Sequence, residues 1–156
     1  MKNADRGERQ RMTREYRSSF ELEPDPPCGL IVRWSGGVRV ADLLRAANVI
    51  SALPSFDNLR YVLNDFSGAT GLAGDHDEHA IVLQDAAAQL IGSRYTNPRV
   101  LHAGAVTDPV VATMLDELSE VAGIPIRQFD SFEGAVGWLS AQNTNALWLY
   151  PQAASN

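Results

Sequence analysis

The sequence has few of the residues that build covalent or metal-bound frameworks. Cys28 is the only cysteine among 156 residues, so no internal disulfide can form, which fits a reducing compartment. No run of about 18 apolar residues exists, and this excludes a membrane span. The N-terminal residues lack the apolar core of a signal peptide, so we expect a cytoplasmic protein.

The length and the charge distribution indicate one domain with a basic tail. A chain of 156 residues can bury a real core without disulfides or metal. Residues 1–17 carry a net charge of +3, which leaves −9 for the remaining residues and argues against a nucleic-acid partner. We interpret residues 1–15 as a flexible tail, residues 16–140 as a single domain and residues 141–156 as a C-terminal extension.

Apolar runs typical of strands alternate with stripes typical of helices. We predict five strands, near residues 17–23, 28–35, 60–66, 99–106 and 124–129, and four helices, near residues 39–53, 75–94, 109–122 and 132–139. Pro24–Pro27 and Gly36-Gly37 are expected as turns on either side of the second strand. The alternation predicts an α/β fold of order β-β-α-β-α-β-α-β-α, with a mostly parallel sheet and a first strand that pairs antiparallel at one edge.

Turn and cap signals separate these elements. A glycine-rich stretch, residues 67–74, is expected as a loop after the third strand. Asp75 precedes Glu78 with the spacing of a capping box, and Asp130 begins the same pattern before the last helix. Asp108 is followed by a proline at the first helical position. We therefore expect Asp75, Asp108 and Asp130 to cap three helices.

Two segments carry a resemblance to a known family. The stretch Leu63–Thr70 reads Leu-Asn-Asp-Phe-Ser-Gly-Ala-Thr, which is similar to the third strand and loop of STAS domains, the family named for sulfate transporters and anti-sigma-factor antagonists. The stretch Arg99–Leu139 resembles the SpoIIAA-like branch through Thr107-Asp108-Pro109, Phe129-Asp130 and a final helix with Ala135-Val136-Gly137-Trp138-Leu139. The resemblance covers residues 16–140 and implies a STAS-like fold and protein binding of the anti-sigma-factor antagonist type.

One departure from that family concerns its phosphorylation switch. Phosphorylated members carry a serine pair further along the loop, and the corresponding positions here are Gly74 and Asp75, neither of which can accept phosphate. The resemblance therefore implies either that the switch is absent or that Asp75 supplies a permanent negative charge. An aspartate at this position is also an ordinary helix cap, because it accepts from free amides and meets the helix dipole.

The resemblance places the binding surface on the loop and helix start after the third strand. Its candidate residues are Asp65, Ser67, Gly68, Thr70, Asp75, His76 and His79. Asp108 and Asp130 are further candidates, because ligands of open α/β sheets bind at the carboxyl ends of the strands. The acids and histidines near Asp75 could share a helix face, but no third ligand follows, so we expect no metal and no cofactor.

The sequence contains no convincing catalytic pattern. Ser67 lacks the Gly-x-Ser-x-Gly elbow, and residues 67–74 lack the Gly-Lys ending of a P-loop. A phosphoacceptor receiver domain needs a lysine near its last strands, whereas Lys2 is the only lysine. His102 is expected as a packed or rim residue within a strand, and Cys28 as a small buried hydrophobe.

Three functional hypotheses remain open at this stage. The favoured one is a non-enzymatic regulatory module that binds another protein, and the alternatives are a carrier or sensor of a small apolar ligand and an enzyme that uses the strand-edge acids. Trp34, Trp138 and Trp148 are expected as core or interface aromatics. The apolar segment Leu147–Tyr150 should cover the domain or reach a second subunit, which would make a homodimer.

Overall fold

A computed structural model describes residues 19–73, 76–91 and 93–145 of the chain. One sheet runs through it in the order β1 (Ser19–Asp25), β2 (Gly29–Val38), β3 (Tyr61–Leu72), β4 (Leu101–Ala105) and β5 (Ile126–Phe129). The helices are α2 (Val40–Ser51), α3 (His76–Leu90), α4 (Pro109–Ala122) and α5 (Phe132–Asn145), with short 3-10 helices η1 (Phe56–Asn58) and η2 (Arg94–Thr96). β1 is antiparallel to β2 and all other pairs are parallel, which confirms the predicted α/β architecture with a mostly parallel sheet and an antiparallel edge strand.

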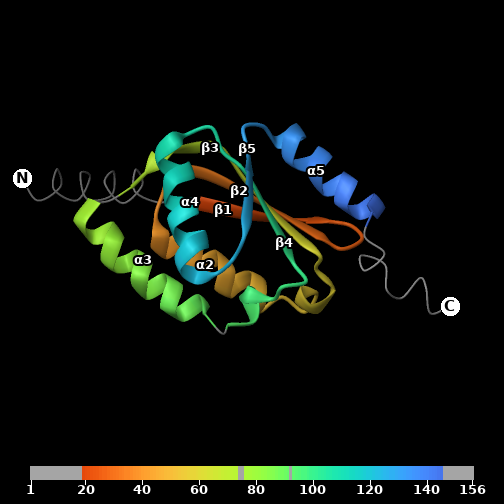
Figure 1. The fold of residues 1–156 in the computed structure, drawn as a ribbon, viewed down its shortest axis with the longest axis horizontal. Helices are drawn as coiled ribbons and strands as arrows, with labels where there is room; N and C mark the ends of the chain where they lie inside the picture. Colours follow the sequence, from red (N-terminus) through yellow and green to blue (C-terminus); the bar gives the residue numbers. More distant parts are fainter. Residues whose placement is uncertain (1–18, 74–75, 92, 146–156) are drawn as a thin grey trace, which may run out of the picture.

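The helices cover the two faces of the sheet unequally. Helices α2, α3 and α4 lie over one face, and α5 lies alone over the other (Figure 1). The side chains of β3 point to both faces of the sheet. Val62 and Phe66 belong to the larger core, while Leu63 packs with residues of α5 on the other face. Polar side chains on the α5 side of β1 and β2 remain exposed, namely Glu21, Glu23, Arg33 and Ser35.

The third strand is longer than predicted. The expected loop at residues 67–74 was wrong for its first part, because β3 continues to Leu72 and still pairs there with Val38 of β2. The expected turn at Gly36-Gly37 likewise lies inside β2, and β1 runs through Pro24 to Asp25. Glycine weakens a strand, and for this reason the sequence indicated a loop.

Two bulges on β3 explain why a glycine-rich stretch can still be a strand. Between the pairs Arg33↔Asp65 and Ser35↔Gly68, β3 advances one residue more than β2, and the same happens again before Val38↔Leu72. At the first bulge, a Cβ on Gly68 would lie 2.8 Å from the carbonyl oxygen of Trp34, so only glycine fits. At the second, Gly71 has φ +102°, which disfavours any residue with a Cβ.

The predicted helix caps had different outcomes. Asp108 caps α4 as expected, since its Oδ1 accepts from the amides of Val110 at 2.9 Å and Val111 at 3.0 Å. The expected cap at Asp130 was wrong by one residue, because Ser131 Oγ accepts from the amide of Gly134 at 3.0 Å and Asp130 lies exposed in the bend before it. Asp75 lies outside the described residues, so its capping role stays a prediction.

Other expectations concern the aromatic residues, Cys28 and the membrane. Trp34 is buried in the main core, as expected, whereas Trp138 and Cys28 are half-buried. Trp148 and the segment 147–150 lie outside the described residues, as does the tail at residues 1–15. In the part of the chain that the structure describes, no helix has the length and apolarity needed to cross a membrane.

Candidate functional site

Asp65 is the structural anchor of the candidate surface. Its side chain points to the α5 side of the sheet and is mostly buried. One carboxylate oxygen accepts from the Ser67 amide at 3.0 Å and also from the Ser67 hydroxyl, and the other accepts from Arg33 Nη1 at 2.9 Å. Asp65 therefore hydrogen-bonds Ser67 within the first bulge of β3 and Arg33 on β2. These contacts hold the backbone at Ser67 in one conformation.

Arg33 links Asp65 to the edge strand. Its Nε donates to Glu23 at 2.9 Å, and its guanidinium lies 5.1 Å from the ring centroid of Phe132 at the start of α5. The hydrogen bond with Glu23 is the main cause that raises the pKa of Arg33, and the charges of Glu23 and Asp65 add to it. Since Arg33 and Glu23 are both about half exposed, we assign this network a positioning role and little stabilisation.

Three predicted site residues lie in the open on the bulged part of β3. Ser67, Gly68 and Thr70 are exposed. The last residue of β3 that pairs with β4 is Asp65, and β3 continues beyond it. We call the segment Ser67–Leu72 the β3 extension. The α4 N-terminus lies beside it: a Cβ on Gly71 would be 3.7 Å from Asp108 Oδ2. The structure therefore brings four of the predicted residues and Asp108 to the same edge of the sheet.

The remaining predicted residues are only partly placed. His76 and His79 lie in the first turn of α3, but their side chains are among those not described, and Asp75 is outside the described residues. Asp130 lies exposed in the bend between β5 and α5. Within the described ranges, no three His, Cys, Asp or Glu side chains are placed to hold a metal ion.

The strand-edge acids already serve the fold. Asp65 is bound by Arg33 and Ser67, and Asp108 accepts two amides of α4. The Ser67 hydroxyl donates to Asp65 with no histidine between them, since His102 pairs in register with Val62 and faces the opposite side of the sheet. Among the side chains that the structure describes at this edge, no nucleophile, base and orienting acid are arranged as in a hydrolytic triad.

Sequence analysis missed a cluster of polar side chains inside the main core. Trp34 Nε1 donates to Asn64 Oδ1 at 3.0 Å, Tyr95 also hydrogen-bonds Asn64, and the Tyr95 and His102 rings lie 5.1 Å apart. Burial lowers the pKa of His102 to about 4 and raises the pKa of Tyr95. The available signal was the presence of Asn64 and His102 within otherwise apolar strands, but their convergence with η2 depends on the tertiary fold.

No family model matches the chain, and no curated protein matches it. Solved structures similar to it include an anti-sigma factor antagonist from Mycobacterium paratuberculosis, which has 14% identity and a TM-score of 0.45, with 78% of this chain and 92% of that chain covered.

Two further similar structures are forms of the anti-sigma factor antagonist SpoIIAA. The unphosphorylated form has 12% identity and a TM-score of 0.40, covering 79% of this chain and 97% of its own. The phosphorylated form of the Bacillus protein has 10% identity and a TM-score of 0.41, covering 78% and 99%. These are resemblances in fold, and they assign no partner and no functional residue to this chain.

Proposed function

We propose that this protein is a non-enzymatic regulatory module that binds another protein through the β3 extension and the adjoining start of α3. The observation that carries the proposal is the exposure of Ser67, Gly68 and Thr70 on a backbone that the fold holds in place. The motif that includes these residues is also the one that resembles the STAS family.

The rigidity of this segment favours recognition. Each residue that must be ordered during binding costs conformational entropy, so a surface that is ordered in advance binds at lower cost. Asp65 fixes the first bulge through two hydrogen bonds from Ser67, and Gly68 allows the backbone to lie against Trp34. A partner would therefore meet a preformed strand surface of small polar side chains.

The chemistry of the acids supports binding over catalysis at this edge. Both Asp65 and Asp108 are engaged by donors of the fold, so neither carboxylate is free to act as a nucleophile or base without loss of those contacts. The exposed polar groups that remain on the extension are the Thr70 hydroxyl and the oxygen of the Ser67 hydroxyl, whose proton is donated to Asp65. Thr70 can donate and accept hydrogen bonds across an interface, and Ser67 can accept them.

A matched pair of surface variants tests the proposal. Thr70→Arg places a large charge on the β3 extension, and Ala141→Arg adds the same side chain at an exposed position of α5. We expect the tagged chain, expressed in its own cells, to recover a specific protein, and Thr70→Arg to lower that recovery at least tenfold while Ala141→Arg leaves it unchanged. Equal recovery by both variants, with unchanged melting temperatures, would contradict the assigned surface.

A further inference from the structure

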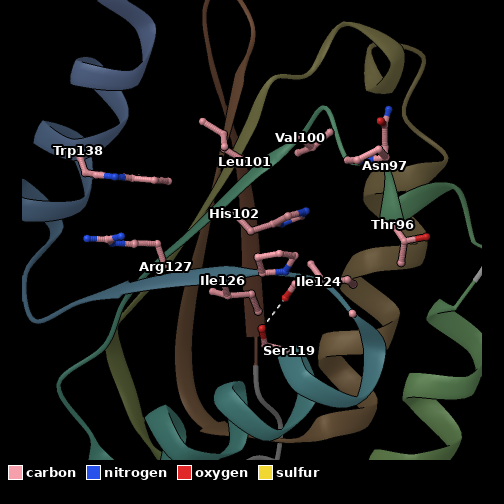
Figure 2. A pocket seen from close by; sticks show the side chains of 13 residues that line it. Thr96, Asn97, Val100, Leu101, His102, Ser119, Ile124, Ile126, Arg127 and Trp138 are labelled. Atoms are coloured by element: carbon pink, nitrogen blue, oxygen red, sulfur yellow. Dashed lines mark hydrogen bonds between the residues drawn. The ribbon is translucent and has the colours of Figure 1, made fainter. Parts of the chain in front are cut away.

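A cavity of about 690 Å³ opens at the amino ends of β4 and β5, at the opposite edge of the sheet from the β3 extension. We call it the amino-edge cavity. Figure 2 shows His102 near its centre, with Trp138 and Arg127 to one side and Thr96 and Asn97 to the other. The proposed protein-binding surface uses none of these residues.

The His102 side of this cavity leads inward. A smaller space of about 40 Å³ shares four lining residues with it (His102, Ser119, Ile124 and Ile126) and extends to Trp34, Asn64 and Tyr95 in the core. None of the described residues that line this inner space is an Asp, Glu, Lys or Arg. Among the described residues that line the outer cavity, Arg127 is the only charged one. Its guanidinium lies over the Trp138 ring, 5.7 Å from the centroid, and both side chains lie to one side of His102 in Figure 2.

His102 is a buried polar side chain with spare hydrogen-bonding capacity at this cavity. Ser119 Oγ donates to the carbonyl of Ile124 at 2.6 Å, and Asn64 accepts from Trp34 and hydrogen-bonds Tyr95. The His102 side chain makes no hydrogen bond within the described part of the chain, although the residue is only 5% exposed. A buried polar group of this kind normally has a partner, and the cavity is where a partner has room.

We propose that the amino-edge cavity binds a small neutral molecule with an apolar body and one hydroxyl group, which forms a hydrogen bond with the His102 imidazole. A neutral imidazole offers one donor and one acceptor nitrogen, so a hydroxyl is a suitable complement. Ile124 and Ile126 supply apolar contacts for the body. A charged ligand group beside His102 would lose its hydration with no opposite charge on the inner walls, which disfavours an anion or a cation there.

Three probe molecules of similar size test this in the full chain. Phenol carries the hydroxyl, toluene lacks it, and benzoate carries a charge. We expect phenol to cause saturable shifts of the backbone amides of His102, Gly123 and Ile124 in NMR spectra. Its dissociation constant should be about three- to tenfold lower than that of toluene, the effect of one hydrogen bond, and benzoate should bind at least tenfold more weakly than phenol.

The variant His102→Phe isolates the hydrogen bond, because it keeps an aromatic ring and removes the imidazole nitrogens. In this variant the ratio of the toluene dissociation constant to the phenol dissociation constant should fall to about one, while Val121→Ala, at an exposed site of α4, should leave that ratio unchanged. The probe comparison in the unmodified chain does not depend on whether the variant folds. The proposal is overturned if phenol gives no saturable shift at these amides, if it binds no better than toluene, or if benzoate binds most tightly through Arg127.

Discussion

Acidification should destabilise the fold through His102 in a predictable pH window. Burial lowers the pKa of His102 from 6.5 to about 4, so the unfolded chain binds a proton at a pH where the folded protein does not. Above pH 6.5 both states are neutral at this residue and the effect is absent. As the pH falls from 6.5 toward 4, protonation of the unfolded state removes stability, and below about 4 the folded state is protonated as well.

The size of this effect follows from the shift. At about 1.4 kcal/mol for each pKa unit, a fall from 6.5 to about 4 corresponds to about 3 kcal/mol in the free energy of unfolding. The Tyr95 ring lies beside the His102 ring, and the part of the inner cavity wall that the structure describes contains no Asp, Glu, Lys or Arg. No acid is therefore placed there to stabilise the imidazolium and reduce the loss.

Urea unfolding at several pH values between 7 and 4.5 measures this. Carboxylates also titrate in that range, so the comparison is with His102→Phe, which retains them all. The unmodified protein should lose stability more steeply than the variant below pH 6.5, by up to about 1.4 kcal/mol per pH unit. Parallel curves for the two proteins would refute the reasoning, because they would mean that His102 titrates alike in the folded and unfolded states.

Three further predictions concern the backbone of the site and its caps, each checked by chemical unfolding. Gly68→Ala should cost about 1–3 kcal/mol, since the new methyl group meets the Trp34 carbonyl, and an unchanged midpoint would contradict the close approach of β2 and β3. Asp108→Ala should cost about 0.5–2 kcal/mol through the lost α4 cap, and no loss would show that the two amides find other acceptors. Ser131→Ala should cost about 0.5–2 kcal/mol and Asp130→Ala less than about 0.5 kcal/mol, whereas the reverse order would restore Asp130 as the cap of α5.

The order of elements was predictable because it depends on local patterns. The helix stripes and the apolar runs of residues 28–35 and 99–106 report burial directly, and Asp108-Pro109 marks a helix start by local hydrogen bonding. The length of β3 was not predictable in this way. Its glycines allow two bulges against β2. The reason for Gly68 is the close approach of the Trp34 carbonyl, which lies on another strand and cannot be seen in the local sequence.

The site was predictable in part for the same reason. The motif from Asp65 to Thr70 indicated a functional segment, and the structure places these residues together, yet the ion pair of Asp65 with Arg33 joins residues on different strands. The choice between Asp130 and Ser131 as cap depends on where the helix begins, and boundaries are the least certain part of any pattern. The core cluster of Asn64, Tyr95 and His102 depends on contacts between segments far apart in the chain.

Site-specific crosslinking tests the central claim, that the β3 extension contacts a protein partner, most directly. A photoreactive benzoylphenylalanine is placed at Thr70 in one sample and at the exposed Ala141 of α5 in another, and both are irradiated in the cells that express the protein. The account predicts a discrete crosslinked species from position 70 that is absent from position 141. Crosslinks from position 141 alone, or equal crosslinks from both positions, would contradict it and place the interface elsewhere.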